Sequence, residues 1–254
     1  MSKIVSDLSM SLDGFITGPN VREGQGMGDG GDRLHDWGFD PVAKTETDAK
    51  IWDEKSASTG AVIMGKRMFD VGFEPWGDPP PFRMPVFIVT HEEREPLQML
   101  GGMTYTSVPD GIEGALSLAH AAAGSKNVGI WGGANIIRQA LSAGLLDEMQ
   151  IHLIPVLLGD GIRLFEGLDP EGIELRKTSS TDTPTATHFR FEVVKRRTSS
   201  GATTLSYEVV KTRMSSGRSV FSSRTSGFDR SLWRRSTCAS VLSRNRRLEN
   251  QMRV

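Results

Sequence analysis

The stretch that decides the fold is VGIWGGANII, residues 128–137. An apolar run rich in Val and Ile ends at Gly132 and Gly133, and a run with the apolar spacing of a helix begins at once. This order predicts a buried strand, a tight turn and an amphipathic helix. Two glycines leave no side chain between the backbone amides and a ligand, and the exposed N-terminus of a helix attracts anions. The stretch therefore predicts either a site for an anion such as a diphosphate, or simply a tight turn.

Two other predicted strand ends carry groups that suit an anion. AVIMGKRMF changes from strand to helix at Gly65, and Lys66 and Arg67 follow where the helix dipole disfavours cations unless a phosphate faces them. VFIVTH ends with the hydroxyl of Thr90 and the imidazole of His91. Together the three strand ends predict one nucleotide lying across the carboxyl edge of a parallel sheet.

Outward from these segments, strand and helix patterns alternate and then strands alone follow. The predicted strands are 3–10, 61–64, 86–90, 128–131, 149–158, 173–180 and 187–195, and the predicted helices are 45–58, 65–71, 111–123 and 134–143. This order predicts an α/β fold with a mostly parallel central sheet flanked by helices and an antiparallel C-terminal hairpin at its edge. Residues 19–40 are expected to form a polar, Gly-rich, mobile loop.

Charge is divided unevenly along the chain. Residues 196–254 hold 13 Lys and Arg against 3 Asp and Glu, whereas the other 195 residues hold 17 against 28. The C-terminal segment is also rich in serine and lacks a periodic apolar pattern, so it cannot offset the entropy cost of ordering. We therefore expect one domain over residues 1–195 and a largely disordered basic tail over 196–254. The tail is either an arm for an acidic partner or a dispensable extension.

Composition and context exclude several kinds of site. The single cysteine, Cys238, excludes a disulfide scaffold and a multi-cysteine metal site, so we expect no metal. No apolar run reaches membrane-spanning length and the N-terminus lacks a signal-peptide pattern, so we expect a cytoplasmic protein without membrane segments. The G-x-G-x-x-G string from Gly26 follows no strand, which argues against a Rossmann site. His91 opens an H-x-E string, but the P-C-x-x-C pair of zinc deaminases is absent.

Several segments, taken in order, resemble the dihydrofolate reductase fold. The resemblance is closest to the reductase domain of bifunctional riboflavin-biosynthesis deaminase–reductases and their stand-alone relatives. The matching segments are SLDGFITG (11–18), AVIMGKRMFD (61–70), VFIVTHEER (86–94), IWGGANIIRQAL (130–141) and LLDEMQIHLIPVLLGDGIRLFEG (145–167). Their order and spacing agree with that family over about residues 3–195.

The resemblance implies NADPH as the hydride donor. By position, 65–67 and 90–91 would face the adenosine 2′-phosphate, 132–135 would hold the diphosphate, and 12–16 would belong to the loop that closes over the nicotinamide. The implied cofactor-binding residues are Leu12, Gly14, Ile16, Gly65, Lys66, Arg67, Thr90, His91, Gly132, Gly133, Ala134 and Asn135. Lys66 stands where the family commonly has Arg, so a preference for NADPH over NADH is expected but depends more on Arg67.

The resemblance also implies a small-molecule substrate, either a heterocycle or a ribosylaminopyrimidine phosphate. Reduction needs a proton source as well as a hydride. In dihydrofolate reductases a carboxylate on the helix after the first loop serves this purpose, and Asp48 is our candidate on the corresponding helix. Asp13, in the loop expected over the nicotinamide, is the second catalytic candidate. The alternative for Asp48 is an ordinary solvated helix acid.

Two functions are therefore compared. The first is an NADPH-dependent reductase. The second is a non-catalytic nucleotide- or nucleic-acid-binding protein that uses the basic tail. Aromatic residues in the tail are few and scattered, so we favour the reductase and expect no nucleic-acid partner. The resemblance is compatible with a homodimer, for which an edge strand near 187–195 could serve.

Overall fold

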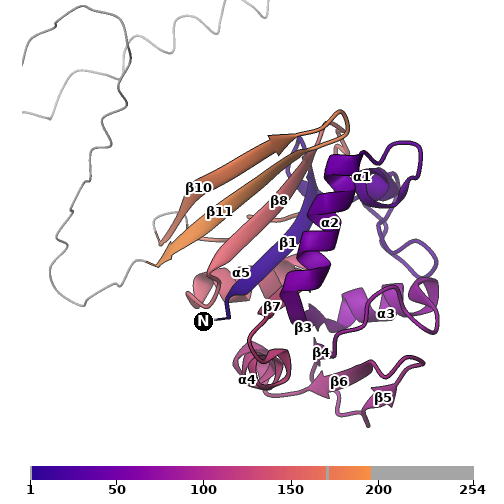
Figure 1. Ribbon diagram of the computed structural model, residues 1–254, viewed down its shortest axis with the longest axis vertical. Coiled ribbons are helices and arrows are strands. Elements are labelled where there is room, and N and C mark those ends of the chain that lie inside the picture. Colours follow the sequence, from indigo (N-terminus) through magenta and orange to yellow (C-terminus); the bar gives the residue numbers. More distant parts are fainter. Residues whose placement is uncertain (1, 170–171, 196–254) are drawn as a thin grey trace, which may run out of the picture. The chain divides into compact units, whose positions relative to one another are not determined.

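A computed structural model describes residues 2–169 and 172–195 (Figure 1). Eleven strands lie in these ranges. They are β1 (Ile4–Ser11), β2 (Phe15–Thr17), β3 (Thr59–Gly65), β4 (Val86–Val89), β5 (Leu97–Gln98), β6 (Thr104–Val108), β7 (Asn127–Gly132), β8 (Glu148–Ile154), β9 (Ile162–Arg163), β10 (Ile173–Asp182) and β11 (Thr187–Lys195). The predicted tail, 196–254, lies outside the described residues.

Nine of these strands form one sheet, in the order β10-β11-β8-β1-β7-β3-β4-β6-β5. The six strands from β8 to β6 in this order run parallel, whereas β11 is antiparallel to β8, β10 to β11 and β5 to β6. The predicted mostly parallel sheet with an antiparallel C-terminal hairpin is therefore confirmed. One detail is wrong: the edge strand is β10, because β11 is paired on both sides.

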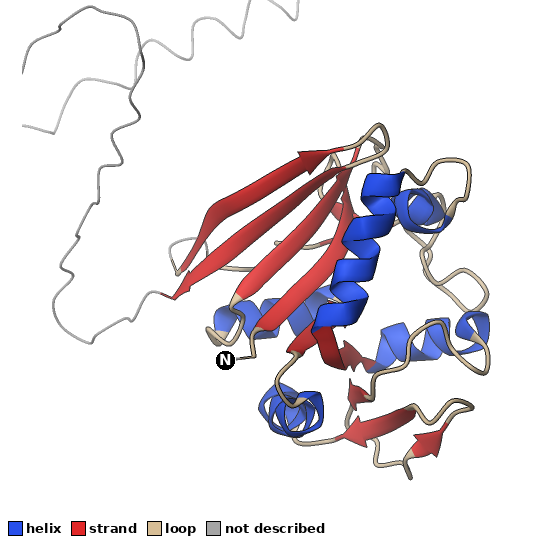
Figure 2. Ribbon diagram, viewed as in Figure 1, coloured by secondary structure: helices blue, strands red, loops and turns tan. Residues whose placement is uncertain are grey.

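Helices cover both faces of the sheet (Figure 2). They are η1 (Gly31–His35), α1 (Asp36–Phe39), α2 (Glu46–Ser58), α3 (Lys66–Trp76), α4 (Gly111–Ala123) and α5 (Ala134–Ser142). Strand β3 shows the two layers directly. Its Ala61 and Ile63 pack with apolar residues of α4 and α5, while Val62 and Met64 pack with those of α3. A strand buried on both faces is apolar throughout, which explains the uninterrupted run AVIM.

Helix α2 packs on the sheet largely through polar contacts. Its sequence, ETDAKIWDEKSAS, has Ile51 and Trp52 as its large apolar residues. Side chains alternate between the two faces of each strand, and the strand register brings polar residues of β1, β8 and β11 together beneath α2. These residues are Asp7, Ser9, Gln150, His152, His188 and Arg190. Three ion pairs join helix and sheet: Lys55–Asp7 at 2.5 Å, Asp48–His188 at 2.9 Å and Glu54–Arg190 at 3.1 Å. Because this interface is polar, exact placement of its partners decides its stability.

The segment 19–40 is a folded connection rather than the expected mobile loop. The Gly18 amide donates to the Met27 carbonyl, and the Asp29 amide donates to the Pro19 carbonyl. A Cβ added at Gly18 would lie 2.1 Å from the Asp29 carbonyl oxygen. A Cβ at Gly28 would lie 2.4 Å from the Pro19 carbonyl oxygen, and one at Gly31 would lie 2.8 Å from the Gly18 amide nitrogen. Close backbone packing therefore accounts for these two glycines of the string without a nucleotide.

The end of the same segment forms η1 and α1, which were not predicted. Leu34 and Trp37 are fully or almost fully buried, and they pack with Ile154 and Trp52. Their i, i+3 spacing within an otherwise polar stretch was the available signal. Strands β5 and β6 were also missed, and α3 continues to Trp76, beyond the predicted end at 71.

Candidate active site

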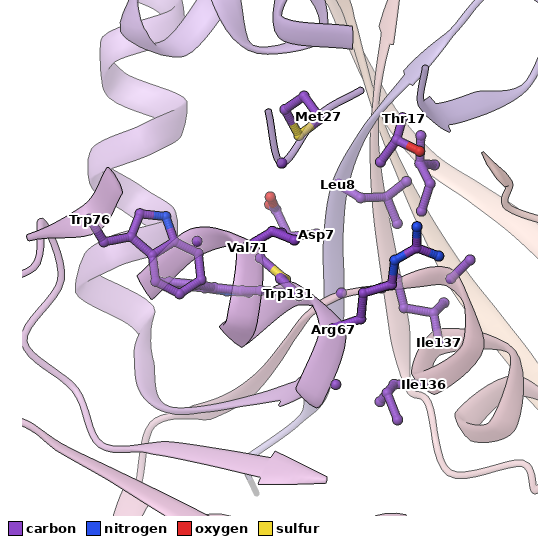
Figure 3. A pocket seen from close by; sticks show the side chains of 18 of the residues that line it. Asp7, Leu8, Thr17, Met27, Arg67, Val71, Trp76, Trp131, Ile136 and Ile137 are labelled. Atoms are coloured by element: carbon purple, nitrogen blue, oxygen red, sulfur yellow. The ribbon is translucent and has the colours of Figure 1, made fainter. Parts of the chain in front are cut away.

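A cavity of about 1470 Å³ opens at the carboxyl ends of β3, β4 and β7, on the face covered by α2 and α3 (Figure 3). Its wall also includes parts of β1, β2, η1 and α2, and residues 24–27 of the connection between β2 and η1. Pockets for a single drug-sized ligand usually measure about 300–1,000 Å³. The cavity therefore has room for a dinucleotide and a second small molecule.

Ten of the twelve predicted cofactor residues line this cavity. They are Ile16, Gly65, Lys66, Arg67, Thr90, His91, Gly132, Gly133, Ala134 and Asn135. The structure thus brings together the three strand ends that the sequence analysis singled out. Leu12 and Gly14 are not among the lining residues, and Leu12 is 61 % exposed.

Asp13 holds the loop between β1 and β2. Its carboxylate accepts hydrogen bonds from the amides of Leu158 and Gly159 and from the Ser11 hydroxyl at 2.6 Å. The Ser11 hydroxyl and the two amides lower the pKa of Asp13 to about 2, although partial desolvation opposes them. Asp13 does not line the cavity. Its contacts fix the loop that carries β2, and with it Ile16, to the cavity wall.

The glycine pair lies at the N-terminus of α5. Gly132 has φ +141°, a conformation that favours glycine, and a Cβ there would lie 2.9 Å from Met68 Sδ. Gly133 has an ordinary φ of −76°, and a Cβ there would meet nothing within 4 Å. A cis peptide joins the two residues. Space thus remains open beside Gly133 at a helix N-terminus, where an anion is favoured.

The two cations after β3 have different partners. Lys66 Nζ lies 2.5 Å from Asp70 and 3.6 Å from Glu92, and the hydrogen bond to Asp70 raises the pKa of Lys66. Arg67 reaches the Val21 carbonyl at 3.5 Å and, within the described residues, has no carboxylate at ion-pair distance. Figure 3 shows the Arg67 side chain on the cavity wall. Arg67 is therefore the cation better placed to receive a phosphate.

Five ionisable side chains form a continuous polar chain behind this wall: Lys55, Asp7, His152, His188 and Asp48. Lys55 Nζ lies 2.5 Å and His152 Nε2 lies 3.3 Å from Asp7 Oδ1. The Nδ1 atoms of the two histidines are 2.7 Å apart, and His188 Nε2 lies 2.9 Å from Asp48 Oδ1. Lys55, Asp7 and His152 line the cavity, whereas His188 and Asp48 do not.

Asp48 is therefore separated from the cavity by the two histidines. It is fully buried, and with Thr45 it forms the capping box at the start of α2. Burial raises the pKa of Asp48, but hydrogen bonds from Thr45 and His188 lower it further, so the net shift is downward. Thr45 is thus the N-cap of α2. Any contribution of Asp48 to a reaction in the cavity passes through His188.

Asp7 was not singled out from the sequence, although its carboxylate lies on the cavity wall. Burial raises its pKa, but the Lys55 ammonium and His152 outweigh burial and hold the pKa of Asp7 well below its usual range. Its second oxygen, Oδ2, is buried without a hydrogen-bond partner among the described residues. A charged residue in the middle of the strand IVSDLSMS was the available signal, because that strand is otherwise apolar or carries hydroxyls.

Aromatic side chains enclose this part of the cavity. Trp37 packs on His152 with ring centroids 4.2 Å apart, and its Nε1 donates to Ser9 Oγ at 2.9 Å. Lys55 Nζ lies about equally far from the rings of Trp52 and Trp131, at 5.0 and 4.9 Å from their centroids. These rings shield the polar chain from water and hold the Lys55 ammonium at the cavity wall.

Comparisons with known proteins agree with this architecture. Residues 2–189 match the family model of the RibD C-terminal domain. A protein from Shewanella sp. PV-4, named as a candidate riboflavin biosynthesis protein, is 20 % identical, with a TM-score of 0.56 over 76 % of this chain and 99 % of its own. A pyrimidine reductase-like protein from Corynebacterium diphtheriae is 14 % identical, with a TM-score of 0.51 over 77 % of this chain and 93 % of its own.

No curated protein sequence matched. Within the described residues no helix is both long enough and apolar enough to cross a membrane. The two structural likenesses and the family match agree on one fold. The chain therefore belongs to the RibD C-terminal domain family and has the dihydrofolate reductase-like fold that its sequence segments led us to expect.

Proposed function

We propose that this protein is an NADPH-dependent reductase of a small heterocyclic or ribosylaminopyrimidine-type substrate. The observation that carries the proposal is the meeting of three strand ends on one cavity, with the open Gly132–Gly133 turn and Arg67 in the same wall. Membership of the RibD C-terminal domain family supports it, as does the likeness to a protein described as pyrimidine reductase-like. Bound NADPH would supply a hydride to the substrate.

The open turn fits a diphosphate. Without side chains, Gly132 and Gly133 let an anion approach the backbone, and Ala134 and Asn135 begin the helix whose N-terminal amides favour negative charge. We assign these four residues to the diphosphate.

The 2′-phosphate is assigned to Arg67, with Lys66, Thr90 and His91 beside it. Arg67 presents a guanidinium that is not neutralised by a carboxylate among the described residues, and such a fork suits a phosphate. The Lys66 ammonium already pairs with the carboxylates of Asp70 and Glu92, so it would contribute less to binding the 2′-phosphate. The preference for NADPH over NADH therefore rests mainly on Arg67.

The nicotinamide and substrate are assigned to the other end of the cavity. That end is formed by β1, β2, η1 and α2 and contains Asp7, Lys55 and Trp37. Asp13 and Asp48, the catalytic candidates from the resemblance, do not line the cavity. We assign them positioning roles, Asp13 through the loop between β1 and β2 and Asp48 through His188. We also retain the predictions that the protein acts in the cytoplasm and forms a homodimer.

Titration of the full-length protein with NADPH and NADH tests the proposal. Energy transfer from tryptophan to the nicotinamide reports binding, since Trp131 adjoins the proposed diphosphate site. We expect saturation by NADPH, with weaker binding of NADH. Arg67→Ala should weaken NADPH binding about tenfold or more and leave NADH binding almost unchanged, because NADH lacks the 2′-phosphate. The control is Arg83→Ala, which changes an arginine elsewhere on the cavity wall.

Two results would contradict the assignment. No binding of either nucleotide by the unmodified protein would remove the reductase proposal. Equal weakening of NADPH and NADH by Arg67→Ala would move the 2′-phosphate away from Arg67.

A further inference from the structure

The polar chain has a defined number of protons. Three contacts join its four ring nitrogens to one another and to two carboxylates: His152 Nε2 to Asp7, Nδ1 to Nδ1, and His188 Nε2 to Asp48. An ionised carboxylate only accepts hydrogen bonds, so each Nε2 must carry the proton of its contact. The Nδ1 atoms are 2.7 Å apart, so one of them must carry a proton for the other to accept. The two histidines together therefore hold three protons and one positive charge.

Charge balance supports the same count. Lys55 and the histidine pair contribute two positive charges, and Asp7 and Asp48 contribute two negative charges. The four carboxylate and imidazole side chains are each no more than 5 % exposed, so an unbalanced charge there would be costly. With one proton fewer, either two Nδ1 lone pairs would face each other or an Nε2 lone pair would face a carboxylate. The structure therefore requires the third proton. This proton can shift between the two histidines, because either Nδ1 atom can hold it.

One end of the polar chain opens on the cavity. Lys55 is 13 % exposed at its side chain and lies beside Trp131, the residue before the Gly132–Gly133 turn. The other end, Asp48, is closed by Thr45 and α2. The Lys55 ammonium therefore presents a transferable proton to the cavity, next to the wall assigned to the cofactor.

We infer that Lys55 is the proton donor of the proposed reduction and that the His152–His188 pair returns a proton to Lys55 through Asp7. The inference rests on the proposed function. Asp48 and His188 are positioning residues in this arrangement, because they hold the third proton on the histidine pair without touching the cavity.

The contacts allow two successive proton transfers, one from Lys55 to the substrate and one from His152 to Lys55. As the substrate carbon accepts a hydride, an N–H bond of Lys55 breaks and a bond forms from that proton to the neighbouring nitrogen or oxygen of the substrate. Lys55 is left as a neutral amine. Asp7 Oδ1, which contacts both Lys55 Nζ and His152 Nε2, passes one proton from His152 to Lys55. The histidine pair then lacks one proton. A hydronium ion that enters from bulk solvent restores it at His152, which lines the cavity, so the net reaction consumes one solvent proton.

The orphaned oxygen of Asp7 fits the same assignment. Oδ2 is buried and unpartnered among the described residues, and Asp7 lines the cavity. An unpaired carboxylate oxygen is costly, so it favours a ligand that brings an N–H or O–H group. A substrate held there would lie against both the acceptor Oδ2 and the donor Nζ.

The charge on the histidine pair depends on groups from every element packed around it. These are Asp7 of β1, His35 of η1, Asp48 and Lys55 of α2, and the two histidines themselves on β8 and β11. Burial, with the nearby Lys55 ammonium, lowers the pKa of His35 to about 4, so His35 is neutral at pH 7. Burial and the neighbouring His152 lower the pKa of His188, and the hydrogen bond to Asp48 together with the charges of Asp48 and Asp7 opposes them. The third proton is therefore expected to depend on Asp7 and Asp48, which favour it, against burial and the nearby Lys55 ammonium, which disfavour it.

Nuclear magnetic resonance of the full-length protein, labelled with ¹⁵N at histidine, tests the proton count without any ligand. The protein has five histidines, and spectra of His152→Gln and His188→Gln assign the two rings. We expect three protonated nitrogens among their four at pH 7. Two protonated nitrogens at that pH would overturn the inference.

Variants of Lys55 test the coupling to the cavity. Lys55→Met removes a positive charge near the pair, so the pH at which the pair loses its third proton should rise by about one unit or more. Lys50→Met, an exposed site on the same helix, should leave that pH unchanged. Lys55→Arg keeps the charge and should also leave it nearly unchanged, which provides a folded variant if Lys55→Met is unstable. A pair that does not respond to Lys55→Met would overturn the relay.

Turnover distinguishes the proton donor from a structural lysine. Oxidation of NADPH is followed with pteridine and ribosylaminopyrimidine acceptors. Lys55→Arg should lower kcat at least about 100-fold with unchanged NADPH binding, because a guanidinium does not release its proton. Unchanged kcat in Lys55→Arg would overturn the assignment of Lys55. Failure of the unmodified protein to bind NADPH would instead remove the proposed function and leave the proton count standing.

Discussion

Gly132 and Gly133 are adjacent but depend on the absence of a side chain for different reasons. Gly132 needs it for folding, because its φ is +141° and a Cβ would press on Met68. Gly133 has an ordinary conformation and open space where a Cβ would be. The sequence predicted both as one turn, whereas the structure shows a folding requirement at Gly132 and open space at Gly133, where we propose that the diphosphate binds.

This separation gives a prediction for two single substitutions. Gly133→Ala should leave stability nearly unchanged but weaken NADPH binding about tenfold or more, since the new methyl group would occupy the space assigned to the diphosphate. Gly132→Ala should lower the free energy of unfolding by about 1–3 kcal/mol, as expected for a strained backbone. Thermal unfolding and the NADPH titration measure the two effects. Undiminished NADPH binding by Gly133→Ala would place the diphosphate elsewhere.

At the scale of elements, α2 is the helix on which the proposed chemistry depends. It supplies Lys55 and Asp48, and its polar face is matched to the polar face of β1, β8 and β11. Its capping box fixes where it begins: the Thr45 hydroxyl accepts from the Asp48 amide, and the Thr45 amide donates to Asp48 Oδ2 at 2.8 Å. The first turn of α2 thus sets the position of Asp48 toward His188.

Loss of the cap should therefore affect both stability and the polar chain. Thr45→Ala is expected to lower the free energy of unfolding by about 1 kcal/mol, the usual effect of removing a helix N-cap. Thr47→Ala, an exposed site in the same turn, serves as the control and should change it little. Urea unfolding followed by circular dichroism measures the difference. Equal effects of the two substitutions would show that the cap contributes nothing particular.

At the scale of the whole molecule, the buried ionisable groups tie stability to pH. His35 is neutral in the folded protein because burial, with Lys55 nearby, lowers its pKa from 6.5 to about 4. The unfolded chain takes up a proton at this residue near pH 6.5, so between about pH 6.5 and 4 it binds more protons there than the folded chain. The contribution of His35 to stability therefore falls as the pH falls through this window.

Comparison with His35→Gln isolates this contribution, because glutamine does not titrate. As the pH falls from 7 to 4, the protein should lose about 1–2 kcal/mol more of its free energy of unfolding than His35→Gln does, allowing for partial exposure of the ring. Urea midpoints across this range give the comparison. Parallel pH profiles for the two proteins would contradict the shift at His35.

Much of the fold could be predicted from local pattern. The apolar runs around 61–64, 86–90 and 128–131 became β3, β4 and β7, and 111–123 became α4 with the same bounds. Strand β6 was missed, although TYTSV is a β-favouring run. The short helices η1 and α1 were missed because Leu34, Trp37 and Phe39 are the only large apolar residues in a polar, glycine-containing stretch.

The sequence by itself determined the order of the main strands and helices, from β1 through α5 to β11, together with the glycine turn and the set of residues at the strand ends. These follow from local spacing and from the rule that parallel strands end at one edge. Only the tertiary structure decided that Asp7, Lys55, His152, His188 and Asp48 form one chain. These five residues come from four separate elements, and no local pattern encodes contacts between residues 36 to 145 positions apart. Packing of α2 against β1, β8 and β11 brings them together and removes the water that would otherwise separate their charges.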